Sequence, residues 1–198
     1  MKTRLLFLIA LLVLTAAVVV LVPRAETPAE PETAETEPAA LPADYCTGND
    51  FTFKEYRTET NESGLAVTLG EIRALSEYAG KPAVVTFWAS WNAPSREQLA
   101  VLAALAGDDG FAVLPVNVGK AGKDSEKKAG AALAEKELTL PLLIDQTGVL
   151  RYNVTSTPRT LVFDAKGNIA ADLSGLHGAE EIREAVDDAR NAEEEDRP

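Results

Sequence analysis

The sequence predicts an α/β domain built on one mixed sheet, and two hydrophobic patterns support this fold class. Residues 83–88 (Ala-Val-Val-Thr-Phe-Trp) form a short continuous apolar run rich in β-branched and aromatic residues, which is typical of a buried central strand. After this run, apolar residues recur at the i, i+3, i+4, i+7 spacing of a helix with one buried face. These residues are Leu99, Leu102, Ala103 and Ala106, and Gly107 ends the predicted helix.

The elements that follow alternate in the same way. Residues 111–118 are expected to form a second strand, and residues 124–136 an Ala- and Lys-rich helix. Two further strands, 160–164 and 169–173, flank the turn 165–168 (Ala-Lys-Gly-Asn) and should pair as a hairpin, which makes the sheet mixed. A last helix carries a third apolar face, formed by Ile182, Ala185, Val186 and Ala189. This order predicts helices packed against a central sheet.

Residues 1–24 are predicted to be a signal anchor with a transmembrane helix. Lys2 and Arg4 precede an uncharged apolar run over 5–22, which is just long enough to span a bilayer. The cationic flank should stay in the cytoplasm while the rest of the chain is exported. No small-x-small cleavage site follows, so we favour an uncleaved anchor over a removed signal peptide. We therefore expect a single-pass cell-membrane protein whose domain lies on the extracytoplasmic, periplasmic side.

The folded domain is expected over 48–190, between two acidic segments. Residues 25–47 are predicted to be a disordered tether rich in Ala, Glu and Pro, because so few large apolar residues cannot offset the entropy of ordering. This segment either holds the domain away from the membrane or only connects the two parts. Residues 191–198 form an acidic tail. The formal net charge of −12, with no basic stripe, excludes nucleic acid as a partner.

The segment 91–95 (Trp-Asn-Ala-Pro-Ser) follows the predicted central strand at the head of a helix. It matches a Trp-Cys-x-Pro-Cys redox site in which both cysteines are replaced. Further matches are Phe87-Trp88-Ala89-Ser90-Trp91, Leu142-Leu143-Ile144-Asp145 with Gly148, Tyr152-Asn153-Val154, and Ser156-Thr157-Pro158 followed by 159–164. On these residues the region from about 48 to 189 resembles the membrane-tethered thioredoxin-like family of extracytoplasmic disulfide reductases, the TlpA and ResA type. The resemblance implies a thioredoxin fold.

The departures from that family concern its chemistry. Asn92 and Ser95 stand where the family has its attacking and resolving cysteines, and neither an amide nor an unassisted hydroxyl replaces a thiolate. Gln98 occupies a position that is often glutamate in the family, and Thr86 one that is a buried aspartate in classical thioredoxins. We therefore expect no catalytic residue at this site, and treat Asn92 and Ser95 as a vestigial redox pair.

Two interpretations of the vestigial site stay open. In one, Asn92 and Ser95 only cap the helix. In the other, the surface still binds polypeptides, because the resemblance implies a shallow docking patch formed by Trp91, Ala93, Pro94, Thr157 and Pro158. The resemblance also implies that Pro158 is cis, which would present the Thr157 backbone for strand-like pairing with a partner.

Cys46 and His177 are the remaining residues with possible chemistry. Cys46 is the only cysteine, so it has no resolving partner in the chain, and it is expected to be an exposed or lightly packed thiol unless it joins another chain. His177 is the only histidine and is expected to be a solvated loop residue. We predict neither a metal site nor a cofactor, because one imidazole without partners does not hold a metal.

The sequence leaves three functions open. The favoured one is a redox-inactive module that binds an extracytoplasmic polypeptide or membrane protein and is held to the cytoplasmic membrane by its anchor. The second is a TlpA-like thiol–disulfide oxidoreductase that acts through Cys46 and a partner. The third is a structural envelope protein, which would tolerate replacement of Trp91, Asn92 and Thr157.

Overall fold

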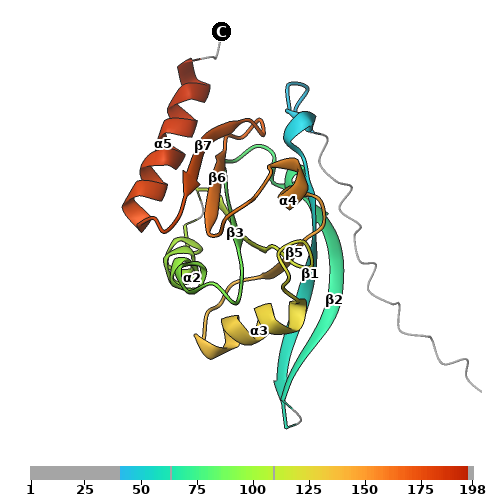
Figure 1. Cartoon of the computed structure of the whole chain (residues 1–198). Coiled ribbons are helices and arrows are strands. Elements are labelled where there is room, and N and C mark those ends of the chain that lie inside the picture. The colour runs from blue at the N-terminus through green and yellow to red at the C-terminus, as the bar shows by residue number, and fades with distance from the viewer. Residues whose placement is uncertain (1–40, 63, 109, 196–198) are drawn as a thin grey trace, which may run out of the picture. The chain divides into compact units, whose positions relative to one another are not determined.

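The structure is a computed structural model that describes residues 41–62, 64–108 and 110–195 (Figure 1). The predicted anchor over 1–24 and most of the predicted tether lie outside the described residues. Within the described ranges, no helix is both long enough and apolar enough to cross a membrane. Tyr45, which falls within the predicted tether, is buried against Gly167, so side-chain packing begins before residue 48.

The described residues form a single seven-stranded sheet in the order β2-β1-β5-β4-β3-β6-β7. Its strands are β1 (Thr52–Asn61), β2 (Gly64–Ala74), β3 (Ala83–Trp88), β4 (Ala112–Asn117), β5 (Leu142–Asp145), β6 (Arg159–Phe163) and β7 (Ile169–Ser174). The α-helices are α2 (Ala93–Leu105), α3 (Glu126–Glu135), α4 (Gly148–Arg151) and α5 (Ala179–Glu195), and the 3-10 helices are η1 (Thr47–Asn49) and η2 (Leu75–Tyr78). The predicted strands and helices are all present, whereas β1, β2 and β5 were not predicted as strands.

The strand predicted over residues 83–88 is β3, and it lies in the interior of the sheet. All six residues of β3 are buried, and the strand pairs in parallel with β4 and antiparallel with β6. β6 and β7 form the predicted hairpin, which confirms a mixed sheet. On the other side, β5 pairs in parallel with β4, and β1 pairs antiparallel with both β5 and β2.

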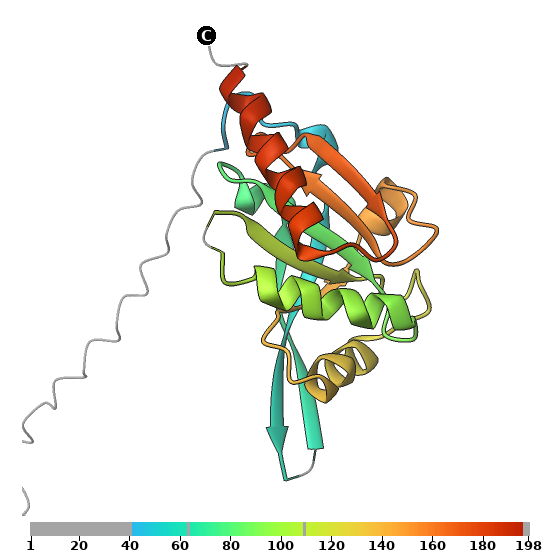
Figure 2. The same ribbon diagram turned by 90° about the vertical axis from the view of Figure 1, so that its left-hand side faces the viewer.

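Different groups of side chains cover the two faces of the sheet. One face carries α2, α3 and α5, which lie side by side over the strands in Figure 2. Its core contains Trp88, whose indole N–H donates to the Pro115 carbonyl at 3.1 Å. The other face holds an aromatic cluster with ring centroids 5.6–6.0 Å apart, formed by Phe51, Phe53, Phe87, Tyr152 and Phe163. Each buried aromatic ring contributes about 2 kcal/mol to folding, so both layers hold β3 firmly in place.

The buried face of α2 differs from the predicted one. Leu99 and Leu102 are buried as expected, but Leu105 replaces Ala106 in the stripe, and Ala106 is exposed at the C-cap. Near its start, the same face buries the polar residues Ser95 and Gln98. The prediction counted only apolar residues, so it did not include Ser95 and Gln98 and assigned the buried face of α2 incorrectly.

Candidate functional site

The first turn of α2 contains the vestigial redox pair. Asn92 is the N-cap, and its side-chain oxygen accepts a hydrogen bond from the Ser95 backbone N–H at 2.9 Å. Pro94 lies in this turn, where its missing N–H would have had no helical partner. The residue at the attacking position therefore serves as a helix cap.

Ser95 behaves differently from the capping residue that the sequence suggested. Its side chain is 0% exposed, and its hydroxyl has no hydrogen-bond partner among the described residues. Only its backbone N–H takes part in the cap. A buried hydroxyl without a partner costs about 1–3 kcal/mol, whereas a thiol behaves as a small apolar group with a weak donor. The surroundings of position 95 thus suit sulfur better than oxygen.

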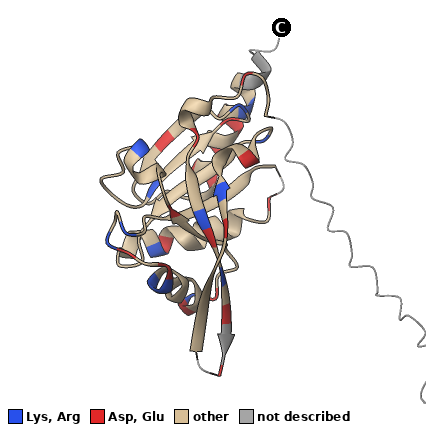
Figure 3. Ribbon diagram, turned by 90° about the vertical axis from the view of Figure 1, so that its right-hand side faces the viewer, with Lys and Arg blue, Asp and Glu red and all other residues tan. Residues whose placement is uncertain are grey.

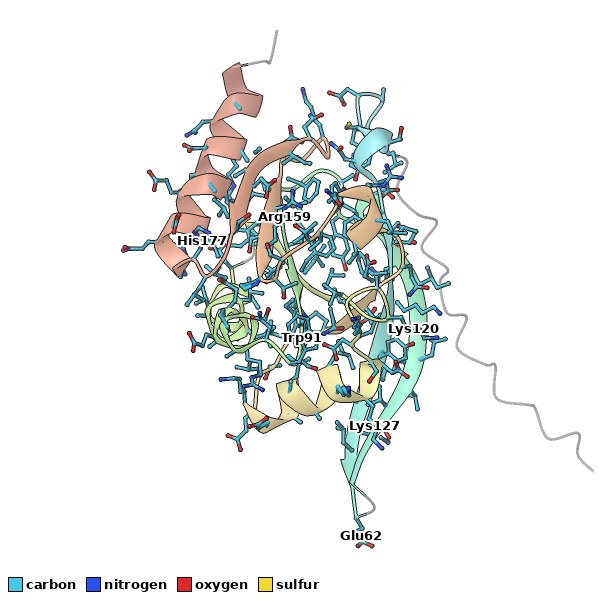
Figure 4. The ribbon with its side chains drawn as sticks, in the orientation of Figure 1. Glu62, Trp91, Lys120, Lys127, Arg159 and His177 are labelled. Atoms are coloured by element: carbon cyan, nitrogen blue, oxygen red, sulfur yellow. The ribbon has the colours of Figure 1, made fainter. Side chains whose placement is uncertain are left out.

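Trp91 projects from the loop between β3 and α2. Its side chain is 59% exposed, yet its orientation is fixed because the indole N–H donates to the Gly122 carbonyl at 3.0 Å. In Figure 4 Trp91 lies between α2 and the β1–β2 hairpin, and Lys120 lies nearer to that hairpin. The Trp91 ring is therefore an exposed apolar surface held against the loop that precedes α3.

The loop before β6 lies beside this ring. The Thr157–Pro158 peptide bond is cis, and the Pro158 carbonyl accepts a hydrogen bond from the Gly175 N–H at 2.9 Å. The backbone N–H and carbonyl of Thr157 make no hydrogen bond within the described residues, and its buried hydroxyl also lacks a partner there. Thr157 thus presents a free backbone edge.

Between Trp91 and Thr157 lies an open depression of about 160 Å³, which we call the Trp91 depression. It is lined by Trp91, Val118, Ala121, Gly122, Val149, Val154 and Thr155 to Thr157. The structure brings Trp91 and Thr157 together here, with Pro158 buried next to them. Ala93 and Pro94, predicted as binding residues, are exposed but do not line the depression. They occupy the first turn of α2.

A buried carboxylate fixes the loops around the depression. Asp124 accepts hydrogen bonds from the Ser90 N–H (2.5 Å) and hydroxyl (2.7 Å), from the Asn117 amide (2.9 Å) and from the Ser125 N–H (2.9 Å). Burial alone would raise the pKa of Asp124, but the bonds from Asn117 and Ser90 outweigh it, so the pKa is lowered. Asp124 joins the ends of β3 and β4 to the start of α3. Sequence reasoning missed this residue.

The other two departures from the family are buried and paired. The Gln98 amide donates to the His177 carbonyl at 3.1 Å, and its oxygen accepts from the His177 backbone N–H at 2.9 Å. The hydroxyls of Thr86 and Thr160 lie 2.9 Å apart across β3 and β6. Both replacements therefore tie elements of the scaffold together.

His177 is not the solvated loop residue that the sequence predicted. Its side chain is 18% exposed, and its Nδ1 lies 2.8 Å from a Glu181 carboxylate oxygen. The two hydrogen bonds between the Gln98 side chain and the His177 backbone hold this part of the chain against α2. Across the described ranges, no group of three His, Cys, Asp or Glu side chains is arranged to hold a metal ion.

Cys46 lies far from the vestigial pair. It is a half-buried free cysteine, and its N–H donates to the Lys166 carbonyl in the β6–β7 turn. That turn follows Phe163, which pairs with Ala83 at the start of β3, whereas Asn92 lies beyond the end of β3. A strand of this length spans about 17 Å, so the Cys46 thiol cannot reach position 92 in the same domain.

A second hollow, of about 320 Å³, borders the first. It is lined by Lys54, Tyr56, Gly119, Lys120, Ala121, Asp124, Ser125, Glu126, Ile144, Asp145, Gln146 and Leu150, and we call it the lysine groove. Sequence reasoning missed it, because the pairing of β1 with β5 is what brings Lys54 and Lys120 into the lining of one hollow. In the sequence, only the group of lysines in residues 120–128 pointed locally to this hollow.

A tryptophan that leads into a helix beside a cis-proline loop, on this sheet topology, is the arrangement of a thioredoxin-like protein. Residues 49–172 match the model of the AhpC/TSA family, and the chain therefore belongs to that family. The match covers more than half of the sequence, which agrees with the extent of the resemblance inferred from the motifs.

Individual relatives confirm the resemblance to thiol–disulfide oxidoreductases of the ResA type. The chain is 36% identical over 121 residues to the thioredoxin-like protein YneN of Bacillus subtilis, covering 60% of this chain and 71% of YneN. It is 33% identical over 119 residues to the thiol-disulfide oxidoreductase ResA of Geobacillus kaustophilus, covering 57% of this chain and 66% of ResA. The solved structure of the exposed lipoprotein thioredoxin Etrx1 of Streptococcus pneumoniae matches with a TM-score of 0.52 and 26% identity, over 67% of this chain and 98% of Etrx1.

Proposed function

We propose that this chain is a membrane-tethered, extracytoplasmic module that binds an extended segment of a partner polypeptide and performs no dithiol exchange at positions 92 and 95. One observation carries the proposal. Thr157, whose backbone is unpaired among the described residues, lines a depression of mixed polar and apolar character beside Trp91, close to a helix start that has Asn92 and Ser95 in place of cysteines. An unpaired backbone edge beside a hollow that can hold a side chain is suited to strand-like peptide binding.

The binding energy would come from two sources. Hydrogen bonds between the Thr157 backbone and an extended peptide would fix its direction, and an apolar side chain in the Trp91 depression would supply the hydrophobic contact. Aromatic anchors of this kind dominate binding energies at many interfaces. The expected cellular location rests on the cationic and apolar character of residues 1–24.

Photo-crosslinking in intact cells tests this function. A photoreactive phenylalanine analogue at position 91 is expected to capture a specific polypeptide, whereas the same analogue at Ile169, an exposed apolar position on the edge strand β7, should not. Replacement of Trp91 by Ala should weaken binding of the captured protein by about tenfold or more. No product from position 91, or the same products from both positions, would count against a docking site.

Thiol exchange through Cys46 is a second candidate, favoured by the names of the relatives and by the partly exposed position of this thiol. The Cys46 thiolate would attack a disulfide of an oxidised partner, which breaks that S–S bond, forms a mixed disulfide with one partner sulfur and releases the other as a thiolate. We expect the full chain not to accelerate insulin reduction by dithiothreitol. If it does, and Cys46→Ala abolishes the rate, the second candidate replaces the first.

A further inference from the structure

We propose that Arg159 is a positioning residue for polypeptide binding, because its guanidinium group holds residues 154–157 in the shape that lines the Trp91 depression. The inference rests on the proposed function and adds to it the residue that prepares the loop for a partner. Arg159 itself does not line the depression. It acts on the partner only through the loop.

The guanidinium group of Arg159 joins two parts of the chain. Its Nε and Nη2 donate to the two carboxylate oxygens of Asp172 on β7, at 2.8 Å and 2.6 Å. Its Nη1 donates to the Tyr152 carbonyl at 2.7 Å and lies 3.4 Å from the Asn153 carbonyl. Figure 4 shows Arg159 between the β6–β7 hairpin and α4. Because a bidentate pair fixes the plane of the guanidinium group, Asp172 directs the remaining nitrogen at the loop.

The carbonyl groups that Arg159 contacts lie at the end of α4. Tyr152 is the C-cap of this helix, and Asn153 follows it in a left-handed conformation with a φ of 50°. The last carbonyl groups of a helix have no partner within the helix, and an arginine side chain can supply one. The ring of Tyr152 is packed in the aromatic cluster, so its carbonyl is a fixed point. Arg159 therefore closes the loop between the end of α4 and the start of β6.

The segment between these two points makes few hydrogen bonds of its own. The Val154 N–H donates to the Val149 carbonyl at 2.9 Å. Thr155, Ser156 and Thr157 make no hydrogen bond within the described residues, although all three line the Trp91 depression. A segment without hydrogen bonds keeps one shape only when its ends are held, because free residues sample several backbone conformations. The shape of the binding loop therefore depends on Arg159.

A simpler role for Arg159, as one half of a surface ion pair between β6 and β7, explains less of this geometry. Exposed ion pairs contribute little to stability because water screens the charges. The Asp172 side chain is 44% exposed, whereas that of Arg159 is 19% exposed. Hydrogen bonds from Arg159 lower the pKa of Asp172, so the carboxylate is charged at neutral pH and orients the guanidinium group. The bonds to the carbonyl groups then act on the loop.

The distribution of charge makes the shape of this loop important for selecting a partner. No charged side chain among the described residues lines the Trp91 depression. Figure 3 shows basic and acidic positions interspersed on the face that carries the β1–β2 hairpin. A surface of mixed sign steers a partner only weakly. Selection would therefore rest on the backbone and side chains of residues 154–157.

Loop order and binding can be measured in the same variant. Arg159→Met keeps an aliphatic stem and removes the guanidinium group. We expect the backbone NMR order parameters of residues 155–157, measured for the full chain in detergent micelles, to fall from about 0.85 to below about 0.6. The yield of photo-crosslinking from position 91 in intact cells should fall about tenfold, because a loop that is competent about a tenth of the time binds about tenfold more weakly.

Arg190→Met is the matched control. Arg190 also pairs with a carboxylate, that of Asp187 at 3.0 Å, and donates to a backbone carbonyl, that of Gly110 at 2.7 Å. These partners lie on α5 and just before β4, and not in the binding loop. Replacement of Arg190 should therefore leave both the order parameters of residues 155–157 and the crosslinking yield unchanged.

The remaining outcomes separate this inference from the proposed function. Asp172→Asn keeps the donor to the Tyr152 carbonyl and should cause smaller changes than Arg159→Met, and equal changes would overturn the assignment to the carbonyl bonds. Unchanged order parameters in Arg159→Met would overturn the inference, as would a disordered loop with an unchanged yield. If position 91 captures nothing in the otherwise unchanged chain, the proposed function fails, and the role of Arg159 in binding fails with it. Capture that Arg159→Met does not weaken refutes only the inference about Arg159.

Discussion

The vestigial redox pair and the residues that surround it differ in how their polar groups are satisfied. At the pair, Asn92 has become a cap, and the Ser95 hydroxyl is buried without a partner. Around it, Asp124 accepts four hydrogen bonds, Gln98 makes two, and Thr86 pairs with Thr160. The side chains of Asp124, Gln98 and Thr86 are therefore all paired, whereas the Ser95 hydroxyl is not.

This difference indicates which side chains of the site stabilise the fold. Asp124 holds the ends of β3 and β4 to the start of α3, and Gln98 holds the chain around His177 against α2. Asn92 and Ser95 stand where the family has its cysteines, and the hydrogen-bonded supports around them are in place. Substitutions in the paired supports should therefore change the free energy of unfolding much more than a substitution at Ser95.

The largest effect is expected at Asp124. Asp124→Ala leaves the Ser90, Asn117 and Ser125 donors without their acceptor, and buried donors without partners are costly. We expect a loss of about 3 kcal/mol in the free energy of unfolding, measured by urea denaturation. Because Ser90 adjoins Trp91, the Trp91 side chain should also become more solvent-exposed before global unfolding, which its fluorescence emission would report. A loss below about 1 kcal/mol would show that the network is not a support.

A smaller effect with a distinct pH dependence is expected from Gln98→Glu. At neutral pH a glutamate there would lack the donor for the His177 carbonyl and would bury a charge, so we expect a loss of about 2 kcal/mol. Burial raises the folded pKa of such a glutamate above its unfolded value, so its stability is present at low pH and is lost as the pH rises through the folded pKa. Unfolding at pH 5 and pH 8, each compared with the parent chain, measures this. Equal losses at both values would contradict it.

The parts of this site that the sequence predicted are those with strong local patterns. The run 83–88, the Trp-x-x-Pro-x segment and the turn 165–168 each specify structure over a few residues, and the structure has β3, α2 and the β6–β7 hairpin there. The cis bond at Pro158 was also predicted, through the resemblance. Local signals of this kind do not depend on which strands become neighbours.

The parts that were missed depend on long-range pairing. β1 carries many charged residues, such as Lys54, Glu55 and Arg57, so its apolar alternation is weak. Its pairing with β5 is what brings Lys54 into the same hollow as Lys120. His177 was missed for the same reason, because its partner Gln98 lies 79 residues earlier. Hydrogen-bond partners of buried polar residues are decided by tertiary structure, which periodicity does not report.

Two carboxylates in the lining of the lysine groove, Asp124 and Asp145, should make opposite contributions to the change in stability as the pH falls. The pKa of Asp124 is lowered, so its stabilisation is present above its unfolded pKa and is lost as the pH falls through the folded value. Burial raises the pKa of Asp145, so protonation at falling pH restores stability that its charge costs at neutral pH. Relative to the parent, Asp124→Asn should therefore flatten the acid loss of stability, whereas Asp145→Asn should steepen it. Urea midpoints between pH 3 and pH 6 measure both slopes. If both variants changed the pH dependence of stability in the same direction relative to the parent, the opposite pKa shifts of Asp124 and Asp145 would be contradicted.

The smallest effect is expected at Ser95. Ser95→Ala removes a buried hydroxyl that makes no hydrogen bond, so the change in the free energy of unfolding should lie within about 0.5 kcal/mol of zero or be slightly stabilising. Ser95→Cys should be at least as stable as the parent, because the thiol tolerates apolar burial. Thr86→Ala is the matched control, since it removes a buried hydroxyl that is paired, and it should cost about 1 kcal/mol. Equal losses for Ser95→Ala and Thr86→Ala would mean that the Ser95 hydroxyl has a partner, and the contrast between the pair and its supports would then disappear.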